Sequence, residues 1–106
     1  MKVLLDEDLP HKLRMNLPGH DTSTVAYLGW NGLKNGDLLS AAEGGNFEVF
    51  VTGDQNLRHQ QNLQQQRLAI VVLSAQDWPT LKGNLTEIAS AVDQATIGSF
   101  RFVECK

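Results

Sequence analysis

The sequence predicts an α/β fold, a three-layer sandwich built on a mostly parallel sheet of five strands. Short apolar runs alternate along the chain with helix-like segments, and this order requires the crossover connections of parallel sheets. The two most apolar runs, 48–52 and 68–73, lack the alternation of a half-exposed strand, which indicates that helices cover both faces. A length of 106 residues with 42% hydrophobic side chains is typical of one domain, 1–106.

Polarity along the chain predicts the order of the strands. The apolar runs 48–52 and 68–73 belong in the centre of the sheet, and the more polar run 20–25 belongs at an edge. An order of about 2-1-3-4-5 satisfies both conditions and makes the first and third strands neighbours at the switch point. In such sheets, ligands bind there, beyond the carboxyl ends of the strands.

The first half of the chain is expected to hold three strands and two helices. The first strand, 2–5, leads into a helix over 8–17, with Asp8 as its N-cap and a proline in its first turn. The edge strand 20–25 follows. A second helix, 38–43, begins after Gly-Asp and ends at Gly-Gly, and the strand 48–52 comes next.

The second half is expected to hold two helices and two strands. A polar helix over 56–66 precedes the central strand 68–73. Asp77-Trp78-Pro79 is typical of a helix start, and the helix after it carries an apolar stripe and ends at Gly98. The last strand, 100–104, alternates apolar and polar residues, so it should be half exposed.

Two of the predicted strands end directly in carboxylates. Asp6 follows the first strand and Asp54 follows the third. Because adjacent strands lie about 5 Å apart, we expect these two side chains to meet. Clustered negative charges are destabilising unless a cation compensates them, and carboxylate oxygens are preferred ligands of Mg²⁺ and Mn²⁺. The sequence therefore predicts that Asp6 and Asp54 hold a divalent metal.

Three further acids are candidates for the same site: Glu7, Asp8 and Asp37. Side chains alternate along extended chain, so Asp8 is expected to point with Asp6 and Glu7 to point away. Asp8 and Asp37 have a competing role, because aspartate at a strand-to-helix junction is a common N-cap. The sequence pattern alone does not decide whether Asp8 and Asp37 belong to the metal site or cap helices.

Three segments carry a resemblance to a known family. The segments are Leu4-Leu5-Asp6-Glu7-Asp8-Leu9-Pro10, Gly36-Asp37 and Val51-Thr52-Gly53-Asp54. They resemble small PIN-like domain proteins, which belong with the PIN superfamily of metal-dependent ribonucleases, many of them toxins of toxin–antitoxin pairs. The resemblance covers 2 to about 73.

The resemblance implies a site and an activity. Asp6, Asp37 and Asp54 would be the catalytic acids and, with Glu7, the ligands of Mg²⁺ or Mn²⁺. The reaction would be hydrolysis of RNA phosphodiesters by metal-activated water. The family further implies an antitoxin protein as partner and a homodimer.

One position departs from the family pattern. A basic residue often follows the third acid, whereas this chain has Gln55. Lys34, Arg58 and His59 are the candidates to replace it as phosphate contacts, although each is more typical of a solvated side chain.

Two other functions compete with a ribonuclease. The first is a non-catalytic PIN-like module that binds a protein partner. The second is a phosphoacceptor domain resembling bacterial receivers, whose outline Asp6, Glu7, Asp54 and Ser74 fit. Receivers also use a lysine after the fifth strand, and here only Lys106 follows it.

Composition narrows the partners and the compartment. A net charge of −3 argues against binding duplex nucleic acid through a broad basic face. No apolar run approaches the roughly 18 residues of a transmembrane helix, so no membrane partner is expected. With one cysteine, Cys105, and no signal-peptide pattern, a reducing cytoplasmic location is expected.

Overall fold

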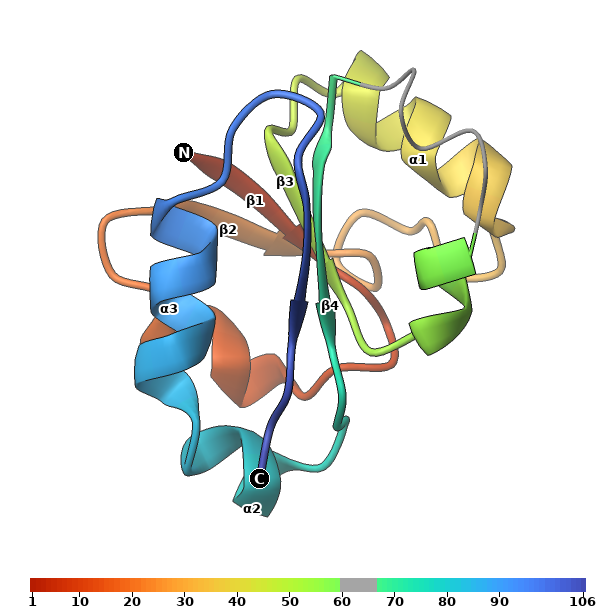
Figure 1. Ribbon diagram of the computed structural model, residues 1–106. Coiled ribbons are helices and arrows are strands. Elements are labelled where there is room, and N and C mark those ends of the chain that lie inside the picture. Colours follow the sequence, from red (N-terminus) through yellow and green to blue (C-terminus); the bar gives the residue numbers. More distant parts are fainter. Residues whose placement is uncertain (60–66) are drawn as a thin grey trace.

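The sheet is five-stranded and all parallel, in the order β2-β1-β3-β4-β5 (Figure 1). The computed structural model describes residues 1–59 and 67–106. Val3 of β1 lies opposite Val49 of β3, so the first and third strands are neighbours. The predicted fold class and strand order are therefore confirmed. The strands are β1 Lys2–Leu5, β2 Asp21–Thr24, β3 Val49–Thr52, β4 Ala69–Leu73 and β5 Phe100–Val103.

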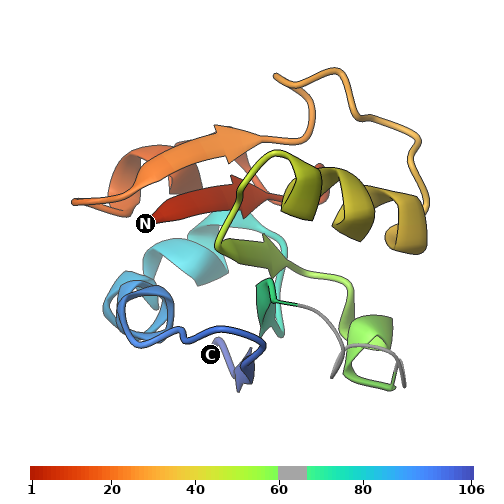
Figure 2. The same cartoon turned by 90° about the horizontal axis from the view of Figure 1, so that it is seen from above.

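Helices cover both faces of this sheet, which makes three layers (Figures 1 and 2). One face carries the 3₁₀ helix η1 (His11–Asn16), α2 (Trp78–Lys82) and α3 (Leu85–Asp93). The other face carries α1 (Asn35–Gly44) and the 3₁₀ helix η2 (Gln55–His59). Successive strand residues face opposite layers. Accordingly, Val49 and Val51 pack in the core below α3, whereas Phe50 packs in the core below α1.

The central strands are the most buried, as their apolar sequences predicted. All residues of β3 and β4 are buried, whereas Asp21 of β2 and Phe100 of β5 are exposed at the two edges. The central strands β3 and β4 are therefore buried up to their ends, and the loops that follow them start from rigid structure.

The predicted helix over 8–17 is wrong in type and extent. Only the 3₁₀ helix η1 forms, and the residue before it, Pro10, has an extended backbone and gives no side-chain cap. Asp8 does not cap it, because both of its carboxylate oxygens accept hydrogen bonds from other loops. The core-facing residue of the segment, Leu13, is nevertheless fully buried.

The predicted last helix is divided into α2 and α3. Asp77 begins α2 as expected, since its Oδ2 accepts from the Thr80 N–H at 3.0 Å and from the Thr80 hydroxyl at 2.6 Å. These bonds lower the pKa of Asp77. The break follows at Gly83 and at Asn84, whose amide donates to the Thr80 carbonyl, an acceptor that a continued helix would use. The helical part ends at Asp93, before the predicted Gly98.

The predicted helix over 56–66 is described only in part. The 3₁₀ helix η2 occupies its start, and residues 60–66 lie outside the described residues. Within the described ranges, no helix has the length and apolar character needed to span a bilayer.

Candidate functional site

Asp6 is held at the carboxyl edge where β1 meets β3. Its backbone N–H donates to the Val51 carbonyl at 2.9 Å, which continues the pairing with β3. Its Oδ2 accepts from the hydroxyl of Thr52 at 2.6 Å, and Thr52 is fully buried. The switch point predicted from strand order therefore carries the Asp6 carboxylate.

Asp54 is held by the same threonine. Its backbone N–H donates to Thr52 Oγ1 at 3.0 Å, so one hydroxyl joins the two acidic segments. The Asp54 Oδ1 accepts from the Asn56 N–H at 3.0 Å, a local turn that starts η2. Asp6 and Asp54 thus lie at one edge, as expected, while their role as metal ligands stays a prediction.

Asp8 is the third acid of this edge. Its Oδ1 accepts from the Gly53 N–H at 3.2 Å, and its Oδ2 accepts from Gln76 Nε2 at 3.3 Å. Burial, followed by the negative charges of Asp6 and Asp54, raises the pKa of Asp8 to about 6. Asp6, Asp8 and Asp54 form what we call the acidic edge.

The alternation of side chains along extended chain makes Asp8 a candidate beside Asp6, whereas the ligand set that the resemblance implies does not include it. The structure agrees with the alternation, because the negative charge of Asp6, two positions earlier, raises the pKa of Asp8.

Glu7 and Asp37 stand apart from this cluster. The Glu7 side chain is exposed, and its backbone N–H donates to Asp6 Oδ1 at 2.8 Å. Asp37 is exposed in the first turn of α1, where a negative charge is favourable to the helix dipole. Neither carboxylate is among the charges that raise the pKa of Asp8.

The other candidate residues serve the scaffold or are undescribed. Gln55 Nε2 donates to the Ser74 carbonyl at 3.2 Å and so links the loop after β3 to the end of β4. The Ser74 hydroxyl accepts from the Cys105 N–H at 2.6 Å, which ties it to the chain after β5. Lys34 is exposed. The side chains of Arg58 and His59 lie outside the described part of the chain.

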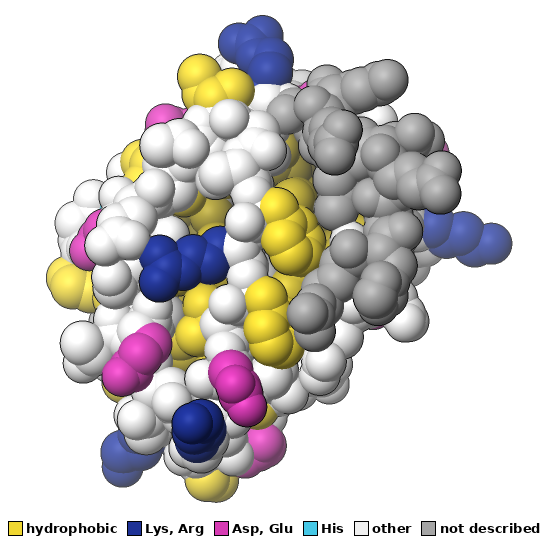
Figure 3. Space-filling model, viewed as in Figure 1, with side chains coloured by type: hydrophobic (Ala, Val, Ile, Leu, Met, Phe, Trp, Pro, Cys, Tyr) yellow, Lys and Arg dark blue, Asp and Glu magenta, His cyan; other side chains and the backbone are white. Residues whose placement is uncertain are grey.

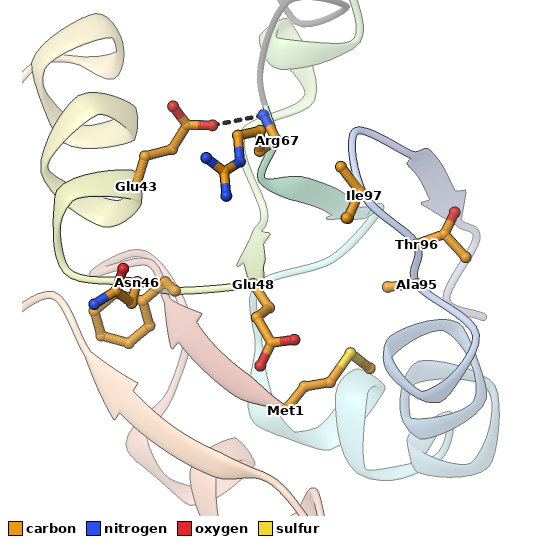
Figure 4. Close-up of a pocket in the computed structure, with 9 residues that line it drawn as sticks. Met1, Glu43, Asn46, Glu48, Arg67, Ala95, Thr96 and Ile97 are labelled. Atoms are coloured by element: carbon orange, nitrogen blue, oxygen red, sulfur yellow. Dashed lines mark hydrogen bonds between the residues drawn. The ribbon is translucent and has the colours of Figure 1, made fainter.

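A separate pocket of about 790 Å³ lies at the opposite, amino edge of the sheet (Figure 4). Two acids line this pocket, and each accepts a hydrogen bond from a backbone N–H. Glu43 Oε1 accepts from the N–H of Arg67 at 2.6 Å, and Glu48 Oε1 accepts from the N–H of Lys2 at 3.0 Å. On the face shown in Figure 3, the Lys and Arg side chains are scattered among other types. Among the described residues, no broad basic surface is visible on that face.

The acidic edge fits an open magnesium or manganese site better than a closed cage. Its donors are carboxylate oxygens, which suit both ions. Across 1–59 and 67–106, no group of three or more His, Cys, Asp or Glu side chains has an arrangement that could hold a metal. Mg²⁺ commonly takes only one or two carboxylates and completes its shell with water and substrate phosphates.

Comparisons with protein-family models, with curated proteins and with solved structures gave no match to this chain. What the structure establishes is therefore the parallel sheet of order 2-1-3-4-5 and the geometry of its carboxyl edge.

Replacing Asp8 by Asn is expected to stabilise the metal-free protein at pH 7. The pKa of Asp8 is about 6 when folded, against an ordinary 3.8, so the folded state binds the proton more tightly than the unfolded chain. Stability should fall as the pH rises from about 4 to 6 and stay reduced above that range. Two pKa units correspond to about 3 kcal/mol, and solvent screening of this half-exposed group reduces the expected gain to about 1 kcal/mol.

Thermal melts between pH 4 and pH 8 measure this effect. The Asp8→Asn variant should lose the decline in stability between about pH 4 and 6, while Asp21→Asn, at an exposed position at the other end of the sheet, should keep it. A lower melting temperature of Asp8→Asn at pH 7 would mean that the hydrogen bonds to Asp8 outweigh the repulsion.

Proposed function

We propose that this chain is a PIN-like, Mg²⁺- or Mn²⁺-dependent ribonuclease. The observation that carries the proposal is the acidic edge: three carboxylates gather at the β1–β3 switch point, where one of them has a raised pKa. Negative charges kept together in this way favour binding of a cation. The resemblance of the segments around Asp6, Asp37 and Asp54 to PIN-like proteins supplies the reaction class.

One or two of the carboxylates of Asp6, Asp8 and Asp54 would hold the cation, and water and substrate phosphates would complete its shell. In this proposal, Asp8 takes the place that the resemblance gave to Glu7 and Asp37, because the latter two are exposed and are not among the charges that raise the pKa of Asp8. A bound divalent cation would supply an activated water and stabilise the charge on the phosphate oxygens.

The residues around the acids give them fixed positions. The Thr52 hydroxyl donates a hydrogen bond to the Asp6 carboxylate and accepts one from the backbone N–H of Asp54, so it fixes both segments. The Asn56 N–H fixes the Asp54 carboxylate. Because Thr52 is buried on the central strand β3, these carboxylates stand on rigid structure, as catalytic groups require.

The substrate and partners follow from the resemblance. A metal can provide the local positive charge that a chain of net charge −3 lacks, which permits binding of an RNA phosphodiester. We further propose an antitoxin protein as the partner, a homodimer and a cytoplasmic location.

Cleavage of a mixed single-stranded RNA pool in Mn²⁺ tests the proposal. Wild type should cut, and chelation by EDTA should stop it. Asp54→Asn should lower the rate about 100-fold or more, because it removes a carboxylate proposed to hold the cation that stabilises charge on the phosphate oxygens. Asp21→Asn, at the exposed amino end of β2, is the matched control and should cut like wild type.

Equal cutting by wild type and Asp54→Asn would reveal a contaminating nuclease. Absence of cutting by both would favour the second candidate function, a non-catalytic PIN-like binding module. Gln55 supports that alternative, since an amide tied to the Ser74 carbonyl stands where a basic residue often contacts phosphate in the family.

A further inference from the structure

The pocket at the amino edge of the sheet combines apolar walls with charged side chains (Figure 4). Its volume of about 790 Å³ lies in the range of small-molecule sites. The apolar part of its lining comes from Met1, Phe47, Ala95 and Ile97. The proposed ribonuclease activity belongs to the opposite edge and makes no use of this pocket.

Arg67 places a guanidinium in the pocket. The residue precedes β4, and its backbone is fixed from two sides: its N–H donates to Glu43 Oε1 at 2.6 Å, and its carbonyl accepts from the Gly98 N–H at 2.9 Å. The side chain points into the pocket, where the guanidinium has no hydrogen-bond or ion-pair partner among the described residues. Its planar fork of N–H donors is therefore available to a ligand that offers two adjacent acceptors.

The two carboxylates of the pocket differ in what they can still accept. Glu43 Oε1 accepts from two backbone N–H groups, those of Arg67 and Leu68, the latter at 3.1 Å. Glu48 is exposed, and its Oε1 accepts one printed-length bond of 3.0 Å, from the Lys2 N–H. Since an ionised carboxylate offers about four lone-pair sites, Glu48 keeps most of its capacity for donors of a ligand.

The mixture of charges selects the kind of ligand. An organic anion would meet the repulsion of two carboxylates, and a cation would meet that of the Arg67 guanidinium. A neutral molecule with one acceptor edge and one donor edge satisfies both signs. Guanine is such a molecule: its O6 and N7 are adjacent acceptors that match an arginine fork, and its N1–H and 2-amino groups are adjacent donors.

Other bases fit these groups less well. Adenine presents one donor and one acceptor beside each other, so it cannot accept both N–H groups of an arginine fork. The flat faces of a base pack well against apolar side chains such as those of Met1 and Ile97.

We propose that this pocket binds a guanine base, with Arg67 on O6 and N7 and Glu48 on N1–H and the 2-amino group. The inference goes beyond the proposed function and does not rest on it, because binding here requires no metal. Free guanosine and a guanine within single-stranded RNA present the same edges to the pocket.

Titration of the ¹⁵N-labelled protein with guanosine, followed by NMR in the presence of EDTA, tests the inference. Guanosine should bind about 10-fold or more tightly than adenosine, because only guanine accepts both bonds from Arg67. The amide signals that shift should include those of Ala95, Thr96 and Ile97, which line the pocket.

Arg67→Met should weaken guanosine binding about 10-fold or more, since it removes the fork and keeps a long side chain. Arg101→Met is the matched control and should stay within about twofold, because Arg101 is also exposed but donates to Gln94 Oε1 at 2.7 Å. Glu48→Gln should also weaken binding about 10-fold. Thermal melts of Arg67→Met should match wild type, because its backbone bond to Glu43 remains.

A second titration identifies the source of the base. A uridine strand with one guanine that binds more tightly than uridine alone assigns the pocket to RNA, and binding of guanosine without binding of that strand assigns it to the free nucleoside. Equal affinity for guanosine and adenosine, or unchanged guanosine binding by Arg67→Met, would overturn the inference. Binding of leucine in place of guanosine would also overturn it and indicate a site for a zwitterionic amino acid.

Discussion

Replacing Phe50 by Ala is expected to lower the free energy of unfolding by about 3–5 kcal/mol. Phe50 is 1% exposed on β3, the middle strand of the sheet, and packs in the core below α1 with Leu39, Leu57 and Ile70. The truncation leaves a cavity that the paired strands cannot close. Because a domain of this kind has a total stability of about 5–15 kcal/mol, this loss is a large fraction of its stability.

Urea denaturation followed by circular dichroism measures this loss. Phe100→Ala is the matched control, because Phe100 belongs to the edge strand β5 and is 41% exposed. It should be less destabilising, by about 1 kcal/mol or less. An equal loss at Phe100 would contradict the edge position of β5 and indicate that a second molecule covers it.

The sheet was predictable because burial leaves a direct signature in strand sequences. The run Val49–Thr52 is apolar without alternation, as a strand covered on both faces requires, and it lies in the centre. The run Asp21–Thr24 contains an exposed aspartate, and it lies at the edge. Once the centre and one edge are known, short right-handed connections leave few orders to choose from.

The helices were less predictable because their ends depend on contacts that are distant in sequence. Asp8 has the residue type of an N-cap, but Gly53 and Gln76 occupy its oxygens, and η1 begins without a side-chain cap. Asn84 breaks the last helix through a bond to the Thr80 carbonyl, at a place where local propensity permits continuation. Tertiary hydrogen bonds decided both cases.

The acidic edge was predictable only in part, because some of its contacts follow from the order of the strands and others depend on residues distant in sequence. Asp6 follows β1 directly and Asp54 follows β3 after one glycine, so the order of the strands alone places them together. The contact between Gln76 and Asp8 leaves no comparable signal in the sequence, because it depends on the space above Gly53.

Replacing Asp6 by Asn should abolish both Mn²⁺ binding and Mn²⁺-dependent RNA cleavage, with a loss of rate of about 100-fold or more. Asp6 raises the pKa of Asp8 and accepts from the Thr52 hydroxyl at 2.6 Å. Asparagine keeps the size of the side chain and removes the charge, so any change in metal affinity reports the missing carboxylate rather than a lost fold.

The Mn²⁺ affinity of Asp37→Asn, compared with that of Asp6→Asn, decides which acids form the site. Because Asp37 is exposed on α1 and is not among the charges that raise the pKa of Asp8, we expect less than about a threefold loss of Mn²⁺ affinity in this variant. Equal losses in the two variants would contradict the ligand set proposed here and restore the set that the resemblance implies, in which α1 supplies a carboxylate to the metal.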